Sequence, residues 1–249
     1  MWITMDIEEV TDMNFDVLWT KNPQINYEKY IDFFIEITKG KKVTTFVLGS
    51  FAKKYPHIIK KISKNVEIAS HGFYHKLIYK ESFDEWKKEI NDSKKLLEDL
   101  IGKKVVGYRS PSWSLPFEKK YYQALFDSGY LYSSSYFPMK NYMYGNSINK
   151  VVPFKVYVDG GFIEERPIAK KIIPFSGGFY FRVLPLWLLK ILFKNTKNPI
   201  LYIHPYELID KNLIKFFWKS ADKNLDYFLA FIHNGNTQNK LKEIVNEIY

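Results

Sequence analysis

Short apolar runs alternate with longer segments of helical period along most of the chain. Runs of this length suit strands, and their alternation with helices is typical of βα units whose strands pair in parallel. The runs cover residues 2–6, 43–48, 66–70, 105–109, 130–135 and 200–204. We therefore predict an α/β fold with a mainly parallel sheet.

Caps, prolines and glycines bound the segments between these runs. The clearest start is Ser82-Phe83-Asp84-Glu85, because a serine followed three residues later by a glutamate has the spacing of a capping box. Helices are predicted from Asn26 to before Gly40, from Pro56, from Ser82 to Gly102, from Pro116 to Gly129, over 184–195 and over 237–249. Residues 216–233 stay ambiguous.

One stretch departs from this alternation. Residues 151–167 are β-rich and irregular, and Gly160-Gly161 and Ser176-Gly177-Gly178 mark turns. We interpret residues 151–182 as a β-rich insertion that shapes one rim of the fold. The 249 residues suit one large α/β domain, and no repeat or linker is visible, so we predict a single domain over 1–249.

The composition narrows the chemistry. The chain contains no cysteine, which excludes disulfides, thiolate metal sites and cysteine nucleophiles. Any metal ion would need nitrogen and oxygen ligands. The formal charge is +10, but the lysines are scattered rather than gathered in one basic arm, so nucleic acid is not the expected partner. An anionic partner such as a membrane surface or a phosphate-linked glycan stays open.

The N-terminal residues lack the basic, apolar and small-residue regions of a signal peptide, and we expect a cytoplasmic protein. The most apolar run, residues 183–193, contains Lys190 and is well short of the ~20 residues that span a bilayer. The helical segment 181–197 has two interpretations. It packs on the core, which we favour, or it makes peripheral contact with the inner membrane.

Carboxylates and histidines follow two of the early strands. In an extended chain the side chains of Asp6 and Glu8 project to the same side, so one can bind a metal while the other handles a proton. The same spacing also occurs in ordinary surface strands. His71 and His75 would share a face and reach one ion if the chain turns into a helix there. A capping serine with chance histidines is the alternative.

Further candidates follow later strands. Arg109 could hold a carboxylate ionised through a bidentate pair, although an arginine on a surface loop is the commoner case. Pro111 and Trp113 suggest a rigid, aromatic-lined mouth suited to a sugar ring. His204 ends the last strand, where it can act as general acid because the ordinary pKa of histidine, ~6.5, lies near working pH. A histidine satisfied by a backbone carbonyl is equally consistent.

Together these segments resemble the polysaccharide deacetylase family, metal-dependent carbohydrate esterases and amidases that remove N-acetyl or O-acetyl groups from sugars. The family has paired carboxylates after a strand, then Ser-His-x-x-x-His, Arg-x-Pro and an apolar strand ending in histidine. The matching segments are Thr4-Met5-Asp6-Ile7-Glu8 and residues 70–75, 109–111 and 201–205. Residues 45–49, 127–130 and 176–182 are similar to a subgroup linked to bacterial surface-polysaccharide synthesis. The resemblance implies a distorted (β/α) barrel with fewer than eight strands.

The resemblance also implies roles. Asp6 is similar to the general base, Arg109 to the tether of Asp6, and His204 to the general acid. A divalent ion, expected to be zinc, would be held by Glu8, His71 and His75, and the oxyanion would meet a backbone N–H near Ser112. The predicted substrate-binding residues are Pro111, Ser112, Trp113 and Tyr130.

Two positions differ from the family pattern. Ile7 separates carboxylates that are adjacent in many members, so the assignment of Glu8 as a ligand depends on strand geometry. Ser133 stands where the subgroup often has an aspartate that would orient the catalytic histidine. Asp127 or Glu165 would then take that task, or His204 would be less basic.

We expect a sugar N-deacetylase of cell-envelope polysaccharide synthesis that acts on an acetamido sugar linked to a nucleotide or a lipid. One alternative keeps the same residues but removes a formyl group or cleaves a non-sugar amide. A glycan-binding protein without catalysis is another alternative, encouraged by Ser133. The sugar, its carrier and the oligomeric state stay open.

Overall fold

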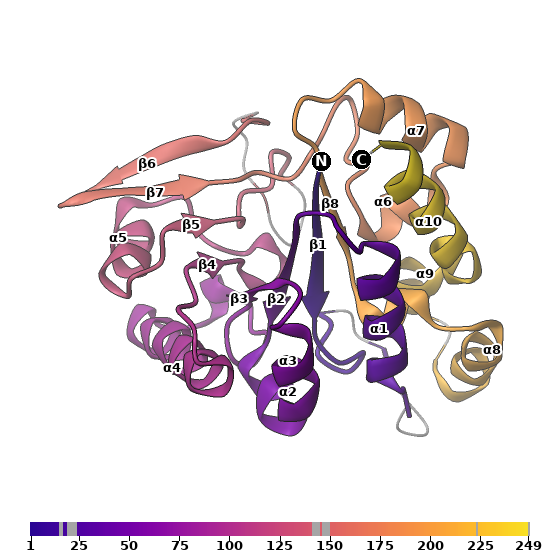
Figure 1. Cartoon of the computed structure of the whole chain (residues 1–249), viewed down its shortest axis with the longest axis horizontal. Helices are drawn as coiled ribbons and strands as arrows, with labels where there is room; N and C mark the ends of the chain where they lie inside the picture. The colour runs from indigo at the N-terminus through magenta and orange to yellow at the C-terminus, as the bar shows by residue number, and fades with distance from the viewer. Residues whose placement is uncertain (15–16, 19–23, 141–144, 146–149, 223, 249) are drawn as a thin grey trace. The chain divides into compact units, whose positions relative to one another are not determined.

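The chain divides into two compact units in the computed structural model, which describes residues 1–14, 17–18, 24–140, 145, 150–222 and 224–248 (Figure 1). The first unit comprises Met1–Val43 and Ala169–Tyr249, and the second comprises Thr44–Ile168. Within the described ranges, no helix is both long enough and apolar enough to cross a membrane.

Two parallel strands form the centre of the first unit. β1 (Trp2–Ile7) pairs with β8 (Ile200–Ile203), with Trp2 opposite Ile200 and Met5 opposite Ile203. Apart from Trp2, every residue of both strands is buried. Burial on both faces explains why β8 shows as a continuous apolar run in the sequence, whereas β1 also buries the polar residues Thr4 and Asp6.

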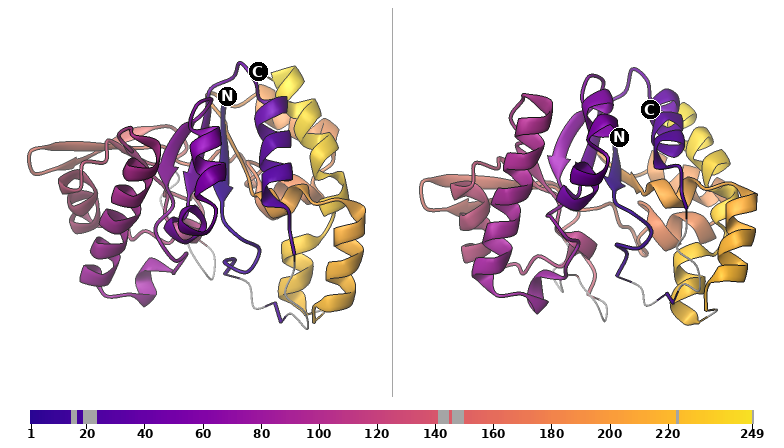
Figure 2. Two further views of the ribbon diagram at one scale, coloured as in Figure 1. Left: turned by 60° about the horizontal axis from the view of Figure 1, so that its bottom comes forward. Right: turned by 90° about the horizontal axis from the view of Figure 1, so that it is seen from below.

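The helices of the first unit come mainly from the C-terminal part of the chain (Figure 2). α10 lies beside α7, where Lys190 pairs with Glu243 at 3.0 Å and also with Glu247. The helices and 3-10 turns are α1 (Tyr27–Ile37), α6 (Gly178–Val183), α7 (Leu186–Lys194), η3 (Pro205–Leu208), α8 (Lys211–Ser220), α9 (Leu225–Phe231), η4 (Asn234–Asn236) and α10 (Thr237–Ile248).

The second unit is a sheet with helices between its strands. The strand order is β6-β7-β5-β4-β3-β2, and every pair is parallel except β6 with β7. The strands are β2 (Val43–Val47), β3 (Glu67–Ser70), β4 (Gly107–Tyr108), β5 (Tyr132–Ser133), β6 (Phe154–Val158) and β7 (Gly161–Glu165). The helices and turns are α2 (Gly49–Lys54), α3 (Pro56–Ile62), η1 (Ile78–Lys80), α4 (Phe83–Ile101), η2 (Pro111–Trp113) and α5 (Lys119–Asp127).

The long helix α4 shows how the local sequence sets an element. The Ser82 hydroxyl accepts the Glu85 N–H at 3.3 Å, and the Glu85 carboxylate accepts the Ser82 N–H at 3.0 Å, so the predicted capping box is present. Gly102 ends the helix with a φ of 66°, a left-handed conformation that glycine adopts readily. Trp86 and Ile90 belong to the buried face.

The structure confirms the predicted α/β class, because seven of the eight described strands have a parallel neighbour and only β6 does not. The stretch 151–167 contains the hairpin of β6 and β7. Two strands are shorter than predicted, because only two residues each of β4 and β5 join the ladder. The ambiguous range 216–233 contains the end of α8 and all of α9.

Gly177 lies where the chain entering α6 passes close to Tyr202 of β8. A Cβ atom at this position would lie 2.1 Å from the carbonyl oxygen of Tyr202, and a backbone oxygen cannot swing aside. We expect Gly177→Ala to lower the free energy of unfolding by ~2 kcal/mol, measured by thermal and urea unfolding. Gly235→Ala is the control, since its Cβ would meet only Ile214 Cδ1, at 3.6 Å. Equal stability of the two variants would contradict this account.

Candidate active site

Three predicted site residues meet at one edge of the first unit. Asp6 lies near the end of β1, Glu8 directly follows the strand, and each residue is only 1% exposed. Because β8 runs parallel beside β1, His204 reaches the same edge directly after β8. His204 Nε2 lies 4.0 Å from Asp6 Oδ2 and 3.9 Å from Glu8 Oε1. The two ends of the sequence thus supply two carboxylates and an imidazole to one place.

Glu207, which is not among the residues predicted from the sequence, contacts the other side of this imidazole. Its Oε2 lies 2.8 Å from His204 Nδ1 and accepts the backbone N–H of His204 at 3.0 Å. An ionised carboxylate can only accept hydrogen bonds, so Nδ1 carries a hydrogen. Nε2 is therefore the nitrogen that faces Asp6 and Glu8.

Arg182 of α6 is the cation that pairs with Glu207. The two side chains form a buried ion pair between Nη1 and Oε1. Arg182 also donates from Nε to the carbonyl of Ile232 at 3.1 Å and from Nη2 to the carbonyl of Leu229 at 2.5 Å. Backbone groups in and after α9 thus hold the guanidinium in place, and we call the series Arg182–Glu207–His204 the ionic chain.

The charges around His204 favour its protonated form. Burial alone would lower the pKa of His204, but the hydrogen bond and charge of Glu207, with smaller effects from Glu8 and Asp6, raise it from 6.5 to about 9. Burial also opposes ionisation of Glu207, yet Arg182 and His204 together hold the pKa of Glu207 below its usual value. The raised pKa favours the imidazolium form of His204 at neutral pH, which is the state that a general acid requires.

Tyr206 contacts both the imidazole of His204 and the carboxylate of Glu8. Its ring stacks on His204, with centroids 5.0 Å apart and an interplanar angle of 15°. Its hydroxyl donates to Glu8 Oε1 at 3.0 Å. This contact orients the Glu8 carboxylate.

The prediction that Asp127 or Glu165 orients His204 is wrong, because Glu207 does so. Asp127 accepts a hydrogen bond from Gln123 at 2.9 Å. The buried carboxylate of Glu165 accepts the backbone N–H groups of Ser135 at 2.8 Å and Tyr136 at 3.0 Å. Glu165 therefore fixes the loop that follows β5.

His71 and His75 lie in the loop after β3, so the helical arrangement considered for them is wrong. Positive φ angles at Gly72 (81°) and His75 (56°) fold this loop, and the two imidazole centroids lie 5.2 Å apart. His71 Nδ1 is 2.8 Å from the carbonyl oxygen of Arg109. Since a carbonyl only accepts, Nδ1 donates and Nε2 is the nitrogen suited to a metal ion.

Arg109 is fully buried, so its reading as an arginine on a surface loop is wrong. Nη2 donates to the Ser134 hydroxyl at 2.9 Å and Nε donates to the Ser134 carbonyl at 3.3 Å. The guanidinium carbon lies 4.0 Å from the ring centroid of Phe46. The predicted tether between Arg109 and Asp6 stays a prediction.

The predicted substrate-binding segment forms the 3-10 turn η2 (Pro111–Trp113). Ser112 and Trp113 have positive φ angles of 48° and 49°. Non-glycine residues rarely adopt this conformation, and such strain clusters at functional sites. Trp113 is buried, with its ring centroid 5.6 Å from that of Phe137, so its part in a sugar-stacking mouth stays a prediction.

Tyr130 is a core residue, and the prediction that it binds substrate is wrong. Its side chain is fully buried, and its hydroxyl donates to the carbonyl of Ile90 at 2.8 Å. A tyrosine at a strand start looks the same in sequence whether its hydroxyl meets a substrate or a backbone carbonyl.

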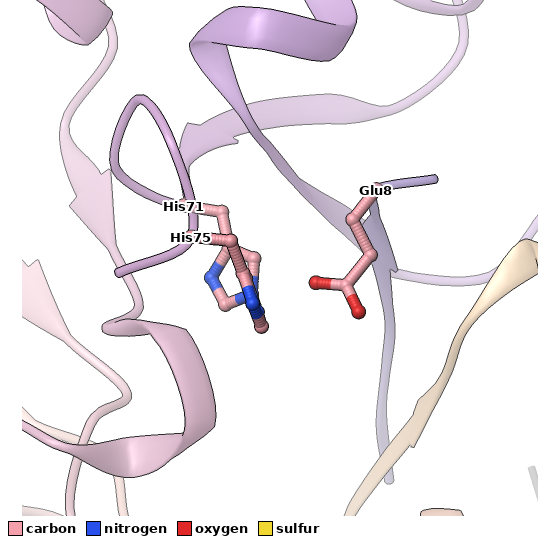
Figure 3. Close-up of side chains that lie close together, drawn as sticks. All are labelled: Glu8, His71 and His75. Atoms are coloured by element: carbon pink, nitrogen blue, oxygen red, sulfur yellow. The ribbon is translucent and has the colours of Figure 1, made fainter. Parts of the chain in front are cut away.

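Among the described residues, one group of side chains has the composition of a metal site: Glu8, His71 and His75 (Figure 3). Each offers one ligand atom, and these atoms lie within 4.8 Å of one another. All three residues are buried. Two imidazoles and one carboxylate are a donor set of catalytic zinc sites, which keep a fourth position for water or substrate, so these residues fit a divalent ion.

Two family models match the chain. The model described as polysaccharide deacetylase matches residues 9–133, and the one described as a domain of unknown function (DUF3473) matches residues 134–249. The first match covers half of the chain, so the protein belongs to the polysaccharide deacetylase family of hydrolases. No curated protein matches the chain in sequence.

Solved structures share its fold. A candidate polysaccharide deacetylase from Mycobacterium smegmatis matches with a TM-score of 0.57 and 18% identity over 90% of this chain and 72% of its own. A family 4 carbohydrate esterase from Streptomyces lividans in complex with acetate gives 0.50 and 8% over 98% and 88%. A mutant of a CE4 family pseudoenzyme with restored enzymatic activity gives 0.50 and 16% over 98% and 62%. At such low identities the structural similarity shows the fold alone, and this fold is the predicted deacetylase-like (β/α) barrel.

Glu207 and Arg182 were not predicted, and the sequence indicates a role for Glu207 more clearly than for Arg182. His204-Pro205-Tyr206-Glu207 carries a usable signal, because an acidic side chain three residues after a capping position can reach back to it. Arg182 is 25 residues away from Glu207 in sequence, and no local pattern links the two. Only the tertiary structure, which brings α6 to η3, does so.

The raised pKa of His204 gives a test that needs no substrate. In metal-free protein we expect the His204 imidazole to titrate near pH 9, followed by NMR of labelled histidine. Glu207→Gln should move this pKa down, because the carboxylate causes the rise, while Glu243→Gln on α10 should not.

The stabilisation from the raised pKa is present below pH 6.5 and is lost as pH rises through about 9, so unfolding should become easier over that range. Titration near 6.5 in wild-type protein would contradict the ionic chain.

Proposed function

We propose that the protein is a metal-dependent hydrolase that removes the acetyl group from the nitrogen of an acetamido sugar. One observation carries the proposal. The imidazole of His204 lies within 4.0 Å of two buried carboxylates, Asp6 and Glu8, on a chain of the polysaccharide deacetylase family, and the carboxylates around it raise its pKa. A proton donor beside a proton acceptor is what amide hydrolysis requires, because water must lose a proton and the departing amine must gain one.

The roles follow from these positions. Asp6 takes a proton from the attacking water, whose oxygen forms a bond to the acetyl carbon. The backbone N–H near Ser112 stabilises the negative charge on the former carbonyl oxygen. The carbon–nitrogen bond then breaks, His204 gives its proton to the sugar amine, and acetate is the second product. Glu207 keeps His204 Nδ1 engaged, so that Nε2 is the atom that gives the proton.

Glu8, His71 and His75 would hold the metal ion, with zinc as the expected element. A bound divalent ion supplies Lewis acidity toward water and the substrate carbonyl. Support comes from the donor set and from the hydrogen bond between His71 Nδ1 and the Arg109 carbonyl, which orients Nε2 as the ligand atom.

We further propose that the substrate is a nucleotide- or lipid-linked sugar of cell-envelope polysaccharide synthesis, which the protein would meet in the cytoplasm. Support comes from the motifs shared with the surface-polysaccharide subgroup. The Streptomyces lividans esterase was solved with acetate, the product expected here. We also propose that both matched ranges form one catalytic domain, because the second contains His204 and the first contains the two ligand histidines.

The metal assignment predicts that His71→Ala loses both bound metal and activity. We expect zinc content to fall from about one ion per chain to a trace, measured by elemental analysis, and acetate release to fall below detection. His57→Ala is the matched control, because His57 is an exposed histidine on α3. Full activity in His71→Ala would sink the metal assignment.

The general-acid assignment predicts a loss in kcat with little change in KM. We expect His204→Gln to lower kcat by about 10²–10⁴-fold, the usual contribution of a positioned acid, measured by acetate release from a soluble acetamido sugar. His233→Gln is the control, because it replaces an exposed histidine of the first unit instead, and it should keep wild-type rates. Unchanged kcat in His204→Gln would mean that another group donates the proton.

Two alternatives have direct tests. Release of formate rather than acetate from a panel of acylated amino sugars would favour a deformylase. A protein that binds glycan without catalysis would hold no stoichiometric metal, and the pseudoenzyme among the structural neighbours shows that the fold permits such members. Ser133 no longer supports this second alternative, since Glu207 supplies the missing carboxylate to His204.

A further inference from the structure

The outer face of α7 is apolar. Leu189 and Phe193 are buried on the inner face of this helix. Trp187 and Ile191 each precede one of them by two residues, which places them about 200° around the helix. They are 64% and 50% exposed. A helix at a water-facing surface normally carries polar residues on its outer face, so this arrangement calls for a partner.

A tight apolar turn lies beside the end of α7. Lys170 forms a bridge with Pro174, and the N–H of Lys171 donates to the carbonyl of Ile173 at 3.3 Å, which leaves Ile172 at the tip, 93% exposed. Directly after the turn, the ring of Phe175 lies 5.0 Å from that of Phe193 of α7, so turn and helix belong to one surface. We call Ile172, Ile173, Trp187 and Ile191 the α7 surface.

The charges that flank the α7 surface are mainly positive. Lys171 precedes the tip of the turn and is exposed, and Lys194 and Lys197 are exposed at and after the end of α7. Two carboxylates of α10 lie nearby, and they pair with lysines of α7: Glu243 with Lys190, and Glu247 with Lys190 and, at 3.6 Å, with Lys194. Lys171 and Lys197 add to the net positive charge of the whole chain.

We propose that the α7 surface docks on an anionic lipid bilayer. Trp187 and the isoleucines enter the interfacial region, where tryptophan is favoured, and the lysines contact lipid phosphates. A bilayer suits this combination better than a protein groove, because the apolar side chains project singly from a helix and a turn while the charges beside them are mainly positive. The proposal does not depend on the proposed deacetylation, since no residue of the α7 surface belongs to the candidate active site.

The test is sedimentation of the full chain with vesicles. We expect wild-type protein to pellet with phosphatidylglycerol-containing vesicles at low salt and far less with pure phosphatidylcholine vesicles. Trp187→Ser with Ile191→Ser should weaken binding by about tenfold or more, because apolar insertion is lost. Lys171→Glu with Lys197→Glu should weaken it by about fivefold per lysine removed, on anionic vesicles only.

Leu225→Ser is the matched control, since it removes an exposed leucine from α9 instead. Circular dichroism should show that all variants fold, and if the apolar double variant does not fold, the lysine double variant carries the test. Absence of pelleting by wild-type protein, or equal pelleting of the variants, would overturn the proposal. A dimer in solution that Trp187→Ser with Ile191→Ser converts to a monomer would overturn it too, because a second copy would then cover this surface. Acetate release from a soluble substrate, measured in parallel, keeps this outcome separate from the proposed function.

Discussion

A buried carboxylate between two cations controls the chemistry of the first unit. Glu207 has no exposed surface and would be costly to ionise alone, but Arg182 on one side and His204 on the other make its charged form the stable one. The same contact fixes which nitrogen of His204 carries a hydrogen and raises the pKa of the imidazole beside Asp6 and Glu8. Orientation and charge state of the candidate acid therefore have one physical cause.

The C-terminal helices provide the support that this arrangement needs. Carbonyls of Leu229 and Ile232 accept hydrogen bonds from Arg182 at one side, and Lys240 of α10 donates to the carbonyls of Arg182 and Leu184 at the end of α6. The region matched as a domain of unknown function thus supplies the candidate acid and the scaffold that orients it. The second unit contributes a different part, a histidine loop held by a backbone carbonyl.

Fold and activity are separate matters in this family. The neighbours include a pseudoenzyme whose activity a mutation restored, so a shared barrel alone does not establish catalysis. In the present chain the proposed hydrolysis depends on particular atoms, namely His204 Nε2 and the oxygens of Asp6 and Glu8. The α7 surface adds a proposed location for that chemistry, because a lipid-linked sugar would be presented at a bilayer.

The sequence by itself determined the features that depend on neighbours along the chain. Alternating apolar runs specified a parallel α/β fold, Ser82 and Glu85 specified the start of α4, and period-two spacing put Asp6 and Glu8 on one side. The histidine loop was misjudged because positive φ at His75 depends on packing rather than propensity. Only the tertiary structure decided that Tyr130 is a core residue and that Arg182 pairs with Glu207. The partner of Tyr130 lies 40 residues away and that of Arg182 lies 25 residues away, and such separations leave no local pattern in the sequence.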